Sequence, residues 1–318
     1  MSNFNPTFDI APTKATVNVK SSLKAARSTG ILTLSNRGID ELPPQIFELD
    51  QCLEDDEKFW EVYTLLIKID CSHNIIRSIS PQIGMFHETL TSLVLRGNEI
   101  EEVVPELYSL QQLVKLDLSR NNIRHLDPLI SSLTSLKDFS ISGNQINEIP
   151  GEVGMMGSLE RLDGSENQIS HLLFHLPPSL RSLNLSKNRI TDIHEDLFEG
   201  CSFLELVDLS KNDLPFLPPS IKSCESLSFL DVQNNHISSF PPLPSQSLRE
   251  AYLGYNEISS FRSFDITAFS ILPITQLHLQ SNQIRNLPEE VFKHFILLFL
   301  YHSLDGRYEG IEGVGYIK

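Results

Sequence analysis

Three residues able to do chemistry together lie at Asp70, Ser72 and His73, which supply a carboxylate, a hydroxyl and an imidazole. Such groups form a nucleophile and its general base when they converge in a pocket beside oxyanion donors. These three instead alternate along one short exposed segment, where no pocket is expected. The chain also lacks phosphate-binding loops and metal-ligand spacings. The sequence therefore predicts no enzyme, no catalytic residue, no cofactor and no metal.

Cysteines offer no better site. Cys52, Cys71, Cys201 and Cys224 form no C-x-x-C pair, a poor basis for a zinc site or a secreted disulfide framework. Cys201 and Cys224 are 23 residues apart, which leaves a disulfide between them open, although the geometry that allows a bridge is narrow. We expect reduced cysteines in the core.

An asparagine recurs inside one hydrophobic sequence motif, as in "LVKLDLSRNNI" (113–123) and "LRSLNLSKNRI" (180–190). Successive copies are 21 to 26 residues apart, and this period with the pattern L-x-x-L-x-L-x-x-N-x-L defines the leucine-rich repeat. An eleventh copy, at 31–39, carries Arg37 in place of the asparagine. The recurrent residues are Asn74, Asn98, Asn121, Asn144, Asn167, Asn188, Asn212, Asn235, Asn256 and Asn282.

The residue types of this motif have a structural explanation. Leu116 and Leu118 alternate with polar residues, so a short strand points both leucines to one face. The asparagine follows where the chain turns inward, and its amide can bond main-chain groups of its own and the adjacent repeat. We therefore interpret the ten residues as a structural asparagine ladder.

The second half of each unit follows L-P-x-x-I-x-x-L, as in "ELPPQIFEL" (41–49), which suits a short helix or 3-10 turn. Two shorter units, 171–180 and 239–248, should cross the convex side of the solenoid, its back, as extended chain. Because neighbouring strands pack closer together than neighbouring back segments, the stack should curve. The sequence predicts an α/β leucine-rich repeat solenoid: a horseshoe with parallel strands on the concave face, and short helices, 3-10 turns and extended segments on the convex face.

The predicted domain organisation follows the repeat. Residues 1–20 are polar and aperiodic and are expected to be disordered, and 21–30 should form an N-terminal capping helix that Gly30 ends. About 11 repeats occupy 31–291, with an insertion at 50–66. The last segment, 292–318, has no asparagine in register. We interpret it as an atypical tail. Three explanations remain open: a natural end of the protein, a truncated product, or an incorrect gene model.

Irregular features suggest a family. The segments "LKAARSTGILTLSNRGIDELP" (23–43), "SLERLDGSENQI" (158–169) and "FPPLPSQSLREAYLGYNEI" (240–258), with the tryptophan-bearing insertion, resemble the leucine-rich repeat-containing protein 40 family of intracellular proteins. The resemblance implies an intracellular solenoid without a catalytic centre. By analogy with related intracellular repeat proteins, it also implies a partner such as a small GTPase or a phosphatase subunit.

The net charge and the targeting signals limit where the protein can be located and which class of partner it can bind. The net charge of −16 over 318 residues argues against nucleic-acid binding and favours a basic partner. The first residues lack the apolar core of a signal peptide, and the longest apolar run, 295–301, is too short to span a bilayer. The sequence therefore predicts a cytoplasmic or nuclear chain with no membrane span.

The candidate partner-binding residues flank the core positions of each strand, where side chains point into the concave face. One such row carries Asp70, Asp117, Asp163, Asp208 and Asp231, and we read most of it as a solvated face. Near its end, exposed aromatic and apolar groups accompany the charges, as binding anchors do, although mutual packing of these side chains is the other interpretation. The predicted partner-binding residues are Leu206, Phe229, Tyr252, Tyr255, Asp208 and Asp231.

These observations predict a non-catalytic scaffold for protein–protein interaction in intracellular signalling or assembly, with its partner on the concave face. The alternatives are a non-functional truncated fragment, an enzyme, or a fragment of an extracellular receptor. Secreted, glycosylated protein would favour the receptor.

Overall fold

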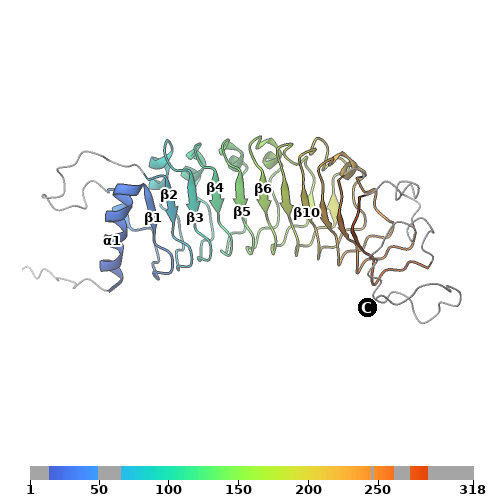
Figure 1. The fold of residues 1–318 in the computed structure, drawn as a ribbon. Helices are drawn as coiled ribbons and strands as arrows, with labels where there is room; N and C mark the ends of the chain where they lie inside the picture. Colours follow the sequence, from blue (N-terminus) through green and yellow to red (C-terminus); the bar gives the residue numbers. More distant parts are fainter. Residues whose placement is uncertain (1–13, 49–65, 245–246, 261–272, 286–318) are drawn as a thin grey trace, which may run out of the picture.

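The computed structural model describes residues 14–48, 66–244, 247–260 and 273–285. Its repeats stack side by side in a curved row, with helix α1 (Lys14–Thr29) at one end (Figure 1). Eleven short strands of the described residues form one parallel sheet in chain order. They are β1 (Ile31–Thr33), β2 (Lys68–Asp70), β3 (Ser92–Val94), β4 (Lys115–Asp117), β5 (Asp138–Ser140), β6 (Arg161–Asp163), β8 (Ser182–Asn184), β10 (Leu206–Asp208), β11 (Phe229–Asp231), β12 (Glu250–Tyr252) and β13 (Gln276–His278).

Each sheet strand buries its middle residue and turns its two outer residues to the concave face. In β4, Leu116 is fully buried while Lys115 and Asp117 face outward. The middle residues pair in register from strand to strand, as Leu116 does with Phe139. This period-two alternation places a continuous apolar core behind the sheet. The predicted leucine-rich repeat horseshoe is confirmed.

The backs of the repeats differ in conformation. Most carry one 3-10 turn, because a proline at or just before the first position of the turn favours a tight turn. An apolar residue of each turn is buried against the core. The shorter unit at 171–180 has no helix and holds β7 (His171–Leu172), which pairs with β9 (Asp192–Ile193) of the next repeat. The 3-10 turns are η1 (Pro44–Ile46), η3 (Pro81–Phe86), η4 (Pro105–Ser109), η5 (Pro128–Ser132), η6 (Gly151–Met155) and η7 (Pro219–Ser223).

The N-terminal helix is longer than the sequence predicted. It begins at Lys14 rather than at residue 21, so part of the segment expected to be disordered is helical. Val19, Leu23 and Ala26 lie on one helical face and pack against the core, which extends the helix toward its N-terminus. Gly30, at φ 70°, ends it. The helix thereby covers the apolar end of the first repeat.

Several predictions concern residues outside the described part of the chain. They include the tail 292–318, and the insertion 50–66 except for Leu66, which is buried. Among the described residues, Cys71, Cys201 and Cys224 are buried free thiols. Burial raises the pKa of the Cys201 thiol to about 11, so it is neutral at pH 7. No helix in the described ranges has the length and apolar character needed to cross a bilayer.

Candidate functional site

The asparagine ladder holds the strands of the concave face at a fixed spacing. All ten asparagines are buried. In Asn121, Nδ2 donates to the carbonyl of Leu118 in its own repeat at 2.9 Å and to that of Leu95 in the preceding repeat at 3.0 Å. Its Oδ1 accepts the Ile100 N–H at 3.1 Å. Each amide therefore joins two repeats, because it pairs main-chain groups that the strand ladder leaves over.

The carboxylate row has a local structural role that the sequence reading missed. The carboxylate Oδ1 of Asp117 accepts the Ser119 N–H at 3.0 Å and the Ser119 hydroxyl at 2.6 Å. In the same slot Asn184 accepts both groups of Ser186, at 3.1 and 2.8 Å. The spacing Asp-x-Ser was the available signal, since it favours an Asx-type turn. All five row members, Asp70, Asp117, Asp163, Asp208 and Asp231, accept the N–H two residues on at 2.9–3.1 Å.

Charges near the middle of the solenoid are matched by neighbouring repeats. The Arg161 guanidinium bonds Asp138, with Nη2 to Oδ2 at 2.6 Å, and this carboxylate raises the pKa of Arg161. Lys137 donates to Glu160 at 2.7 Å and thereby lowers the pKa of Glu160. Arg181 pairs in the same way with Glu205 at 2.7 Å. Since these side chains are partly or fully open to solvent, screening by water keeps the contribution of each pair to stability small.

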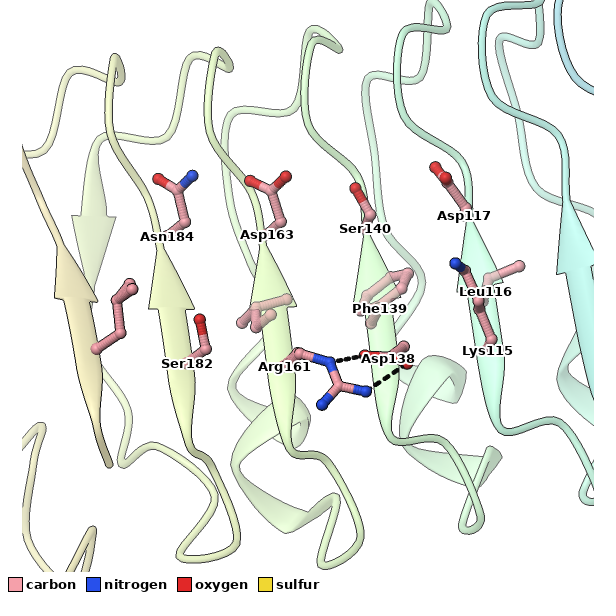
Figure 2. Close-up of a pocket in the computed structure, with 12 residues that line it drawn as sticks. Lys115, Leu116, Asp117, Asp138, Phe139, Ser140, Arg161, Asp163, Ser182 and Asn184 are labelled. Atoms are coloured by element: carbon pink, nitrogen blue, oxygen red, sulfur yellow. Dashed lines mark hydrogen bonds and ion pairs between the residues drawn. The ribbon is translucent and has the colours of Figure 1, made fainter. Parts of the chain in front are cut away.

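A hollow of about 470 Å³ lies over β4, β5, β6, β8 and the start of β10. Figure 2 shows Arg161 reaching across to Asp138 on the adjacent strand, with the row of Asp117, Ser140, Asp163 and Asn184 along one side. The buried middle residues of the strands form its floor. This part of the concave face is polar, and the charges of Arg161 and Asp138 within it are paired with each other.

Aromatic side chains gather on the next strands. The rings of Phe229 and Tyr252 have centroids 5.4 Å apart, and those of Tyr252 and His278 stack at 4.5 Å. Leu206 lies in register beside Phe229. We call Leu206, Phe229, Tyr252 and His278 the aromatic patch. All four side chains are half-buried. Part of each side chain is therefore covered by its neighbours, and the rest is exposed on the concave face.

At its apolar and aromatic positions, the aromatic patch differs from the predicted site by two residues. His278 was missed, although the alternation in "QLHLQ" (276–280) puts it in the slot of Tyr252. Burial lowers the pKa of His278, which keeps the ring neutral at pH 7. Tyr255 was expected on the same face but lies in the turn after β12, at φ 55° and 53% exposed. The chain has left the strand there, so the side chain no longer follows its alternation.

Two carboxylates border the aromatic patch without a matching cation. Asp208 and Asp231 are register neighbours on β10 and β11, and neither forms an ion pair within the described residues. Burial raises the pKa of Asp231 to about 6, and the charge of Asp208 adds to the rise. The Gln233 N–H and the charge of Lys211 only partly offset this effect. Asp231 therefore carries an unfavourable charge at neutral pH.

Replacing Asp231 with asparagine is expected to stabilise the protein at pH 7. Asn184 shows that an amide accepts the same main-chain N–H in this slot. The pKa of Asp231 is about 6 when folded against an ordinary 3.8, so its ionisation costs stability progressively as pH rises between these values. Urea unfolding at pH 4 and pH 7 should show a gain for Asp231→Asn that is largest at pH 7. An equal difference at both pH values would contradict the assignment.

The comparisons with known proteins agree on the repeat. A family model described as "Leucine rich repeat" matches residues 88–146, 111–169 and 178–237. Podocan-like protein 1 of Mus musculus is 39% identical over 124 residues, which cover 37% of this chain and 22% of that protein. Lumican of Bos taurus is 29% identical over 283 residues, covering 82% and 75% of the two chains. The chain spans 22–39% of the length of the podocan and podocan-like relatives it matches.

Among solved structures, the leucine-rich repeat domain of APL1 superimposes with a TM-score of 0.70 at 20% identity, covering 89% of this chain and 70% of that one. This likeness supports the fold alone. The curated relatives lumican and podocan are non-enzymatic proteins, and they support the prediction that this chain is not an enzyme.

Two predictions are corrected by these findings. The relatives are podocan, lumican and mimecan rather than members of the leucine-rich repeat-containing protein 40 family. They are secreted proteoglycans of the extracellular matrix, which points away from a cytoplasmic or nuclear location. The partner classes drawn from the resemblance, a small GTPase or a phosphatase subunit, lose their basis with it. The repeat, the parallel sheet and the family model support the fold in common: the chain folds as a leucine-rich repeat solenoid.

Proposed function

We propose that the concave face binds a protein partner and that the aromatic patch is its anchor. The observation that carries the proposal is the continuous ring contact of Phe229, Tyr252 and His278 across three neighbouring strands, with their rings only half-buried. Aromatic side chains supply large contact area at low cost in side-chain entropy, and they are enriched among residues that dominate binding energy.

The surroundings of the aromatic patch support this role. On one side lies the polar hollow over β4 to β10, whose ion pairs are already satisfied. On the other, the Tyr252 hydroxyl lies 3.1 Å from Glu250 Oε2 and 3.1 Å from Gln276 Oε1. These contacts fix the ring before any partner arrives, so less conformational entropy is lost on binding. A prearranged apolar centre with a polar surround is the usual anatomy of a protein interface.

Truncation of the patch tests the proposal. Phe229→Ala and Tyr252→Ala should each weaken binding by about 2 kcal/mol or more, because anchor side chains at an interface centre contribute that much. Proteins that copurify with the full chain are compared by quantitative mass spectrometry, and thermal unfolding of each purified variant checks the fold. The matched control is Phe203→Ala, which removes an exposed aromatic side chain outside the patch.

The expected result is loss of the same partners in both patch variants, with unfolding temperatures close to wild type and full recovery in the control. If both variants retain every partner, the patch is not the anchor. A large drop in unfolding temperature would show instead that the rings serve to stabilise the sheet.

A further inference from the structure

We propose that Asp208, Asp231 and the ring of Phe229 or Tyr252 form a subsite for an arginine side chain of the protein partner. This inference rests on the proposed function of the concave face and names what the patch recognises. It starts from the uneven distribution of matched charges along the sheet.

In the middle of the solenoid, some acidic side chains meet a cation from the adjacent repeat, as Asp138 meets Arg161. Asp117 and Asp163 have no such cation among the described residues, but the strand of Ser140 separates them. Asp208 and Asp231 differ from both cases because two carboxylates occupy adjacent strands. They are neighbours in register, and in the described part of the chain neither has a cation in ion-pair contact. Two like charges side by side destabilise the fold unless a cation lies between them.

The free atoms of this pair point to a donor-rich ligand. In each residue Oδ1 accepts a main-chain N–H, from Ser210 at 2.9 Å and from Gln233 at 2.9 Å. Each Oδ2 has no partner among the described residues and is left to accept from outside. A guanidinium presents several N–H donors in one plane, which suits two adjacent carboxylates better than the single point charge of an ammonium.

The rings complete the recognition. Phe229 lies on the same face of β11 as Asp231, and Tyr252 is in register with Asp231 on β12. A guanidinium that bonds a carboxylate can also stack on an adjacent aromatic face, and this cation–π contact strengthens as the site becomes desolvated. The net charge of −16 attracts a basic segment over a longer range. Charge complementarity therefore favours an arginine-bearing peptide segment as the occupant.

Peptides of defined charge test the subsite with the whole 318-residue chain. The probes are three fluorescein-labelled 12-residue Gly/Ser peptides that carry two arginines, two lysines or two citrullines at the same positions. Anisotropy titrations at pH 7.5 and 0.15 M salt should show the arginine peptide binding about tenfold more tightly than the citrulline peptide, the gain expected of charge-assisted hydrogen bonds. Equal affinity of the lysine peptide would overturn the guanidinium assignment.

The matched variants separate a built subsite from diffuse attraction. Asp208→Asn with Asp231→Asn should reduce the affinity for the arginine peptide about tenfold, toward that of citrulline. Asp117→Asn with Asp163→Asn removes the same charge from the same strand slot and should change it less than twofold. Equal losses in both pairs would overturn the proposal, since only net charge would then matter. Misfolding is controlled by urea unfolding, in which Asp231→Asn is expected to be more stable than wild type at pH 7.

The outcomes also separate this inference from the proposed function. If Phe229→Ala and Tyr252→Ala lose their copurifying partners while the double variant Asp208→Asn, Asp231→Asn keeps all of them, the concave face binds a partner without an arginine subsite. If neither set of variants loses a partner, both proposals fail.

Discussion

Replacing Asn121 with alanine is expected to lower the unfolding free energy by about 3 kcal/mol, because one buried main-chain N–H loses its acceptor and two buried carbonyls each lose one of their two amide donors. The Ile100 N–H loses its acceptor, and the carbonyls of Leu95 and Leu118 each lose a donor. Water cannot replace the amide without entering the space between two repeats. The effect is large for one side chain because each bond lies where solvent is excluded.

The neighbouring residue supplies the control. Asn122 is the same residue type and is half-buried, and among the described residues its side chain has only a 3.5 Å contact from Gln145 Nε2. Asn122→Ala should change the unfolding free energy by less than about 0.5 kcal/mol. Denaturant unfolding followed by circular dichroism measures both, and hydrogen exchange should show lost protection at the Ile100 amide in Asn121→Ala alone. Similar midpoints for the two variants would show that the ladder does not stabilise the stack.

Substituting Gly154 with alanine is expected to cost about 2–3 kcal/mol through overpacking against the next repeat. A Cβ at this position would lie 2.3 Å from the carbonyl oxygen of His175. That atom belongs to the backbone, so it cannot rotate away. The approach is close because 171–180 crosses the back as extended chain, without the 3-10 turn found in η6 beside it.

Gly157 provides the comparison, since a Cβ there would meet nothing within 4 Å. Gly157→Ala should be neutral or should stabilise by about 0.4–1 kcal/mol, because alanine restricts the unfolded chain. Thermal and urea unfolding of the two variants give the comparison directly. A tolerated Gly154→Ala would mean that the back of this unit shifts at little cost.

Asp231 is a position where stability and proposed function diverge. Asparagine satisfies the same turn at Asn184, yet an aspartate with a raised pKa stands beside another aspartate at the edge of the aromatic patch. A more stable variant that binds less well would identify the carboxylate as a binding group, because proteins accept local destabilisation mainly where a site requires it.

The sequence by itself determined the repeat, the strand positions and the inward leucines. Each follows from local rules: period-two alternation, an amide at the inward turn, and a recurring spacing. The same rules explain why the family assignment failed. The motif around Leu116, Leu118 and Asn121 is dictated by core packing that every solenoid of this kind shares, so similarity within it carries little information about a particular family or its location.

Only the tertiary structure decided which side chains meet across repeats. The contact of Phe229 with Tyr252 is diagonal, because Tyr252 is in register with Asp231. The pairing of Tyr252 with His278 joins repeats 26 residues apart, and Tyr255 leaves the face at a left-handed turn. The two ring contacts depend on the in-register stacking of neighbouring strands, which is the same whatever the length of the segment that joins them. A local pattern assigns a side chain to a face, but its neighbours come from the stacking of separate repeats.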